Sequence, residues 1–138
     1  MITGKLVAGI GLALGVTLFA GWAWGATGRT AVSRQLEASE LRDDLLGARA
    51  AILDARVALY VTNFGEASQH LEGARGLLRR ADVRMTSVGR TADSEQLATA
   101  MAGIDDAQRM SGKLDLNANA RAGEAAQIMA TLLATAAR

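Results

Sequence analysis

The 138-residue sequence contains no cysteine and no proline, and aromatic residues make up only 4% of it. Without cysteine the chain can form no disulfide, thiolate metal site, thioether-linked haem or thiol nucleophile. Without proline nothing forces a helix to break, and alanine-rich runs such as residues 48–53 have the composition of packed helices. We therefore expect an all-α protein.

The sequence also lacks a dominant sign of charge. Its 15 basic and 14 acidic residues are interspersed and give a formal net charge of +1. Because no strong single-sign field attracts a phosphate backbone, we predict no nucleic-acid partner.

One long apolar run, residues 6–24, contains Thr17 as its single polar side chain. At ~1.5 Å per residue this run reaches about 28 Å, close to the hydrocarbon thickness of a bilayer. We predict a transmembrane helix that has Lys5 at one membrane interface and Trp22 and Trp24 at the other. The alternative is a signal peptide cleaved after about residue 25. Because the sequence begins with Met1, we expect an uncleaved anchor.

The predicted membrane helix carries small residues at helical spacing on one face. They are Gly4, Ala8, Gly11 and Gly15. Such a face allows a second helix to approach closely in lipid, so we predict that it packs on other subunits of a membrane complex. The run contains no histidine to ligate haem or a chlorophyll-type magnesium, and we predict no cofactor.

The likeness of residues 1–25 to an export signal also suggests an orientation. It favours a cytoplasmic N-terminus and a periplasmic C-terminal portion, which places the protein in the bacterial inner membrane. The predicted domains are an anchor at residues 1–28 and an extramembrane helical bundle at residues 29–138.

Four-three spacing of apolar residues predicts the first two helices of that bundle, separated by Asn63-Phe64-Gly65. The first helix is expected to face inward through Leu41, Leu45, Ala48, Ile52, Ala55 and Leu59, with Leu46, Leu53 and Tyr60 widening the stripe. The second is expected to do so through Ala67, Leu71, Ala74, Leu78, Ala81, Met85 and Val88.

Turn and cap residues predict two further helices. We expect Gly89 to close the second helix, Asp93 or Ser94 to cap the third, Gly112 to end the third, and Asp115 or Asn117 to start the fourth. The inward residues would be Leu97, Met101 and Ile104, then Ala122, Ala126, Met129, Leu133 and Ala136. The prediction is an antiparallel up-down-up-down bundle with a core rich in small residues.

The residues that could carry chemistry are sparse. His70 is the single histidine, and Glu66 precedes it by four residues, whereas a di-iron bundle needs Glu-x-x-His with further carboxylates. Asp43-Asp44 and Asp105-Asp106 point about 100° apart on a helix and are expected on solvated faces. We predict no active site, metal site or small-molecule substrate, and hence no enzyme.

Arginines crowd the end of the predicted second helix, where cations complement the helix dipole. If that helix returns towards the membrane, Arg84 and Arg90 approach the level of Arg29 and Arg34. All four could then contact anionic headgroups or an acidic partner subunit.

Residues 63–74, Asn-Phe-Gly-Glu-Ala-Ser-Gln-His-Leu-Glu-Gly-Ala, resemble the second-helix part of a tetratricopeptide repeat, which implies a helix-hairpin interaction module. The whole architecture is similar to the small single-span accessory subunits of bacterial photosynthetic and respiratory complexes. That resemblance implies a non-catalytic subunit that braces a larger assembly. The alternatives are a membrane-tethered sensor or binding module, or a secreted binding protein if residues 1–25 are removed.

Overall fold

The computed structural model describes residues 32–136 of the chain. It divides the chain into two compact units, Met1–Ala38 and Ser39–Arg138. In the first unit, residues 32–38 are described, and they are helical and exposed. The predicted membrane helix at residues 6–24 and the predicted domain boundary at residues 28/29 lie outside the described residues and stay predictions. Among the helices that are described, none combines the length and the apolar character that a membrane span needs.

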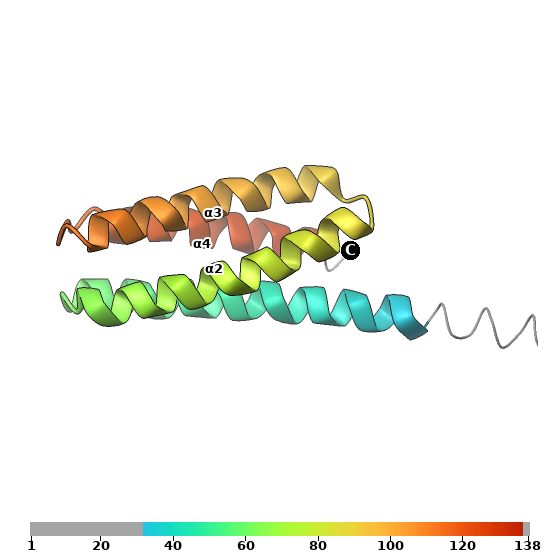
Figure 1. Cartoon of the computed structure of the whole chain (residues 1–138), viewed down its shortest axis with the longest axis horizontal. Helices are drawn as coiled ribbons and strands as arrows, with labels where there is room; N and C mark the ends of the chain where they lie inside the picture. The colour runs from blue at the N-terminus through green and yellow to red at the C-terminus, as the bar shows by residue number, and fades with distance from the viewer. Residues whose placement is uncertain (1–31, 137–138) are drawn as a thin grey trace, which may run out of the picture. The chain divides into compact units, whose positions relative to one another are not determined.

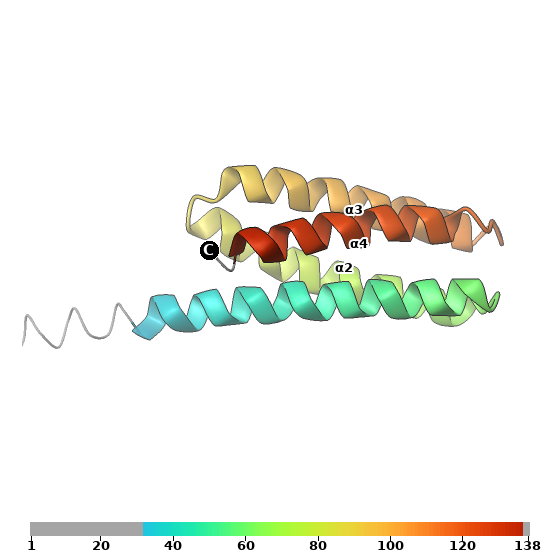
Figure 2. The same cartoon turned by 180° about the vertical axis from the view of Figure 1, so that it is seen from behind.

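Residues 32–136 form four helices and no strand, which confirms the all-α prediction for this part of the chain. The helices are residues 32–60, called here the first helix, α2 (Phe64–Ser87), α3 (Thr91–Ser111) and α4 (Ala118–Ala136). Within Ser39–Arg138 consecutive helices run antiparallel (Figure 1), and α4 lies beside the first helix when the bundle is seen from behind (Figure 2). The predicted up-down-up-down order is therefore present.

The core of the bundle combines many alanines with larger apolar residues. Apart from Val88, every inward residue predicted at four-three spacing in the first helix and in α2 is buried, from Leu41 to Leu59 and from Ala67 to Met85. In α3 and α4 the buried positions are Leu97, Ala100, Ile104, Ala107, Ser111, Ala118, Ala122, Ala125, Ala126, Met129 and Leu132. The many alanines of the core let neighbouring helices approach closely, because interaxial distance depends on the side chains at the contact.

The prediction of an inward-facing side chain is wrong for several residues. Leu46 and Tyr60 are 45% and 83% exposed, because each follows a core position by one residue and points about 100° away from it. Val88 is exposed because α2 ends at Ser87 and leaves Val88 as its cap. In α3 and α4 the side chains of Met101 and Leu133 are only partly buried.

One error in the prediction accounts for both Met101 and Leu133. The sequence interpretation favoured large side chains, whereas the seam of α3 and α4 runs through alanines such as Ala100 and Ala125, and through Leu132. Ala136, the last residue predicted to face inward, is half-buried.

All three turns close with the same hydrogen-bond pattern at a residue in the left-handed region. At the end of the first helix, Thr62 has φ 59°, and the N–H of Asn63 donates to the carbonyl of Ala58 at 2.8 Å. Gly89 closes α2 with φ 73°, as the sequence predicts, and Leu114 closes α3 with φ 58°. In each case the donor lies five residues beyond the acceptor, which defines a Schellman motif.

The expected helix boundaries hold in part. Asn63 caps α2, since its Oδ1 accepts from the Glu66 N–H at 3.3 Å. Gly112 caps α3 as expected, although its φ of −63° is right-handed and the left-handed residue is Leu114. Neither Asp93 nor Ser94 caps α3, because the helix begins at Thr91. Asn117 directly precedes the first residue of α4, in agreement with the prediction.

Candidate functional site

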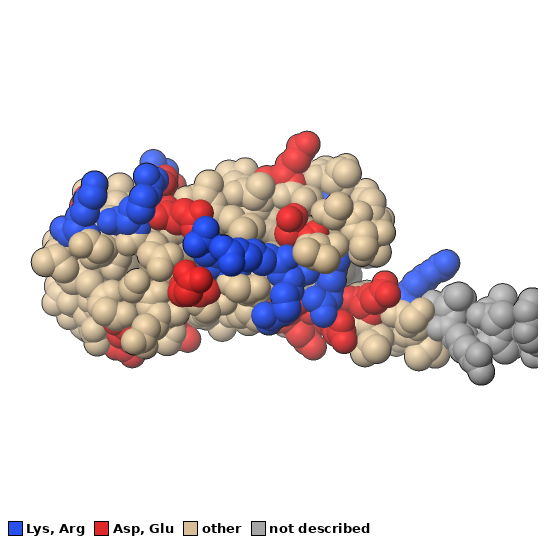
Figure 3. Space-filling view, viewed as in Figure 1, with Lys and Arg blue, Asp and Glu red and all other residues tan. Residues whose placement is uncertain are grey.

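The boundary between the first helix and α2 is held by ion pairs around one buried carboxylate. The Asp44 side chain is only 10% exposed, and its two oxygens accept from Arg80 Nε at 3.1 Å and from Arg84 Nη1 at 3.0 Å. Arg84 also donates to Glu40 at 2.7 Å. Figure 3 shows Lys and Arg side chains in a band across this face with acidic groups beside it. The prediction of a solvated Asp44 is therefore wrong, and its charge is neutralised within the bundle.

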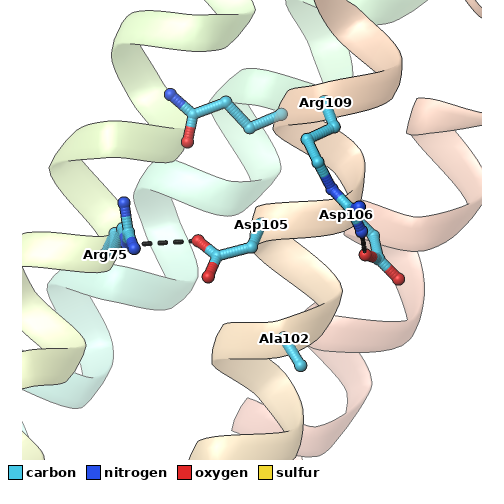
Figure 4. Close-up of a pocket in the computed structure, with 6 residues that line it drawn as sticks. Arg75, Ala102, Asp105, Asp106 and Arg109 are labelled. Carbon is cyan, nitrogen blue, oxygen red and sulfur yellow. Dashed lines mark hydrogen bonds and ion pairs between the residues drawn. The ribbon is translucent and has the colours of Figure 1, made fainter.

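The boundary between α2 and α3 contains an open hollow of about 530 Å³. In it Arg75 points from α2 towards Asp105 on α3, with Nε 3.1 Å from Oδ1, while Arg109 pairs with Asp106 (Figure 4). Each cation in this hollow therefore has a carboxylate partner, and nothing here calls for an external charge.

A second hollow, of about 510 Å³, lies between the first helix and α4. It is lined by Arg49, Leu53, Arg56, Gly123, Glu124, Ala126, Gln127 and Ala130. Arg56 crosses to α4, where its Nε donates to Asn119 Oδ1 at 3.0 Å and its carbonyl accepts from Asn119 Nδ2 at 3.1 Å. A Cβ at Gly123 would lie 3.3 Å from the Arg56 Cζ, so this glycine makes room for the guanidinium.

This hollow continues towards the end of the bundle that carries the first and third turns. The adjoining space, of about 310 Å³, is lined by Leu53, Arg56, Val57, Tyr60 and Asn119. We call the two together the Arg49/Arg56 groove. It brings two guanidinium groups and several apolar side chains to one face of the bundle.

Large apolar side chains gather at that same end. They are Val57, Tyr60, Val61, Leu114 and Leu116, between 61% and 83% exposed, and we call them the apolar end. The Ser111 hydroxyl donates to the Phe64 carbonyl at 3.2 Å, which ties the third turn to the first. The end that carries both turns lies on the left in Figure 1, and much of its surface is uncharged in Figure 3.

The residues predicted to meet headgroups or an acidic partner are only partly brought together. Arg84 does return beside the first helix, where it pairs with Asp44 and Glu40. Arg90 pairs with Asp93 on its own helix at 2.7 Å. Arg34 is exposed, whereas Arg29, Lys5, Trp22, Trp24 and the four small residues of the predicted membrane face lie outside the described residues. The contact of these residues with a membrane or partner stays a prediction.

The other candidate residues assemble no recognisable chemistry. His70 Nε2 lies 3.8 Å from Glu66 Oε1 on the surface of α2. Within residues 32–136 no group of three or more His, Asp or Glu side chains is placed to hold a metal ion.

Sequence reasoning missed the Arg49/Arg56 groove, although a signal was present. Arg49, Leu53, Arg56 and Tyr60 each follow a core residue by one position and so repeat the four-three spacing of the core. Asn119, Gly123, Ala126 and Ala130 do the same on α4. Two stripes at that spacing, one rich in arginine and one in small residues, would have indicated a second seam.

We compared the chain with models of protein families, with curated proteins and with solved structures, and none of them matches it. The resemblances to accessory membrane subunits and to a tetratricopeptide hairpin therefore stay predictions.

Proposed function

We propose that this protein is a non-catalytic accessory subunit of a larger membrane protein complex. In this proposal residues 6–24 anchor it in the bacterial inner membrane, with the N-terminus in the cytoplasm, and the bundle braces other subunits in the periplasm. The proposed assembly is a photosynthetic reaction centre with its antenna, or a respiratory complex.

The apolar end is the observation that carries this proposal. Its five side chains come from the last turn of the first helix and from the two turns that follow the first helix and α3, and each is more than half exposed. Contiguous exposed apolar surface is uncommon on monomeric proteins and marks sites where another molecule docks. A subunit that is covered at this end in its assembly would retain such side chains, whereas a free bundle gains nothing from them.

The backbone at the apolar end supports the same conclusion. Thr62 and Leu114, one in each turn, adopt left-handed φ values that cost roughly 1 to 2 kcal/mol in a residue other than glycine. The turn at the opposite end uses Gly89 and avoids this cost. Residues with strained backbone conformations cluster at functional sites. In this bundle both strained turns lie at the apolar end.

Isolation of the intact chain in mild detergent tests the proposal. We expect it to migrate with other membrane proteins, and we expect a Val57→Asn/Leu116→Asn variant to be released from them. Val83→Asn is the matched control, because Val83 is 70% exposed on α2 and lies outside the apolar end. A wild-type chain that runs alone, or an apolar-end variant retained as well as the control, would refute the proposal.

The intact mass of the isolated chain distinguishes the alternative. A mass that lacks about 25 N-terminal residues, as signal-peptide processing would produce, would favour a secreted binding protein and would remove the anchor from the proposal.

A further inference from the structure

The four helix boundaries of the bundle differ in how their charges are compensated. Between the first helix and α2, Asp44 and Glu40 neutralise Arg80 and Arg84. Between α2 and α3, Asp105 faces Arg75. Between α3 and α4 the backbones approach closely, since a Cβ at Gly103 would lie 3.6 Å from the Ala125 Cβ.

The fourth boundary, the Arg49/Arg56 groove, has no such compensation. Neither Arg49 nor Arg56 forms an ion pair with any carboxylate of the described residues. The acidic side chain that lines the groove, Glu124, is already bonded to Arg121 at 2.8 Å. That hydrogen bond is the main cause of the raised pKa of Arg121. The groove therefore carries two positive charges that the bundle does not balance.

Arg49 has a second unmet requirement. Its Nε is buried and has no hydrogen-bond partner within the described part of the bundle. Arg75 Nε also has no hydrogen-bond partner there, but it lies 3.1 Å from Asp105 Oδ1, whereas Arg49 forms no ion pair with a described carboxylate. A buried donor without a partner is costly, and a guanidinium pairs best with a carboxylate or another planar anion that can accept two parallel hydrogen bonds. Arg49 Nε thus lacks an acceptor, and an anionic acceptor satisfies this guanidinium best.

The shape of the groove limits what can supply them. Arg49 and Arg56 are seven residues apart on one face, and a rise of about 1.5 Å per residue separates their Cα atoms by about 10.5 Å. The α4 side is lined by Gly123, Ala126 and Ala130, which are small enough for another helix backbone to approach. Beyond Arg56 the groove opens to Val57 and Tyr60, which an apolar side chain can cover.

We propose that the Arg49/Arg56 groove receives a helix of a partner protein that presents two acidic residues seven positions apart. Their carboxylates pair with Arg49 and Arg56, an apolar residue between them packs on Leu53, and another covers Val57 and Tyr60. This inference rests on the proposed function, because it specifies the chemistry of the subunit on which the bundle docks. The partner helix would have the pattern acidic-x3-apolar-x2-acidic-x3-apolar.

Binding of synthetic helical peptides to the intact chain in a nonionic detergent tests this pattern. The probe carries Glu at both acidic positions, and matched peptides carry Gln or Lys there. We expect the Glu peptide to bind at least about tenfold more tightly than the Gln peptide, as charge-assisted hydrogen bonds at two sites require. An Arg49→Gln/Arg56→Gln variant should lose this preference.

Charge reversal gives the sharper result. An Arg49→Glu/Arg56→Glu variant should reject the Glu peptide and bind the Lys peptide, which a merely unfolded variant could not do. The control is Arg42→Glu/Arg79→Glu, which changes net charge equally at two exposed arginines without ion pairs in the described bundle. We expect this control to bind the Glu peptide as the wild type does, within about twofold.

Several results would overturn the inference. Equal binding of the Glu and Gln peptides, or an equal loss in the Arg42/Arg79 control, would mean that only net charge matters. Self-association abolished by Arg49→Glu/Arg56→Glu would assign the groove to a second copy of the chain. Flotation with phosphatidylglycerol vesicles that is abolished by the same substitution would assign it to lipid headgroups.

The inference and the proposed function can fail separately. If the chain runs alone in detergent but selects the Glu peptide, the assignment as a subunit fails and the anion preference of the groove remains. If the chain migrates with other membrane proteins and the Arg49→Glu/Arg56→Glu variant does so equally well, the groove assignment alone fails.

Discussion

Replacement of Asp44 by asparagine should destabilise the bundle more than any other substitution of an acidic residue in the first helix. The change keeps the size of the side chain but removes the negative charge that Arg80 and Arg84 share. Removal of one partner from a fully buried ion pair costs about 3 to 5 kcal/mol. The arginine side chains here are 55% and 29% exposed, so water can solvate part of the charge left behind. We therefore expect a loss of about 1 to 3 kcal/mol.

Urea unfolding of the intact chain, followed by circular dichroism in mild detergent, measures this loss. Urea is suitable because it is uncharged, whereas guanidinium salts screen the ion pairs under study. Asp43→Asn is the matched control, since Asp43 is the neighbouring residue, is exposed, and makes no ion pair with another described residue. We expect this control to change stability by less than about 0.5 kcal/mol.

A double-mutant cycle isolates the contact itself. With Arg84→Gln in the background, Asp44→Asn should cost about 1 kcal/mol less than it does in the wild type, because the Asp44–Arg84 part of the interaction is already gone. Equal losses from Asp44→Asn and Asp43→Asn, or a coupling energy near zero, would refute the view that Asp44 holds the first helix to α2.

Two further predictions concern the core and the turns. Ala107→Leu should destabilise the bundle by about 1 to 3 kcal/mol, because Ala107 is fully buried in the close-packed seam, whereas Ala98→Leu at an exposed position should be near neutral in the same unfolding assay. Thr62→Gly and Leu114→Gly should each stabilise by about 1 kcal/mol, and Gly89→Ala should destabilise by a similar amount, because all three residues have positive φ. A gain from Gly89→Ala, or losses at both other turns, would contradict this account.

The sequence predicted what depends on periodicity and missed what depends on pairing across helices. The four-three spacing from Leu41 to Leu59 and from Ala67 to Met85 was enough to identify the core of two helices. Gly89 was identified as a turn because glycine is the residue best suited to positive φ. Thr62 and Leu114 have the same backbone geometry without that chemical signature, so no local rule finds them.

Partners that are distant in the sequence account for the remaining differences. The burial of Asp44 depends on Arg80 and Arg84, about 36 to 40 residues away, and only the packed hairpin brings them together. Arg49 and Arg56 were not predicted to form a site, and the fold places Gly123 and Asn119 of α4 opposite them. The charge balance of a surface is a property of the assembled bundle.

The placement of the aromatic residues in the sequence makes the predicted anchor and the groove separately visible to spectroscopy. Tyr60 is the single tyrosine of the chain and lies 83% exposed at the mouth of the Arg49/Arg56 groove, whereas both tryptophans, Trp22 and Trp24, belong to the predicted anchor. Tryptophan emission therefore reports on the environment of residues 22–24 alone. A change in tyrosine emission reports on what covers the groove, without any label introduced into the chain.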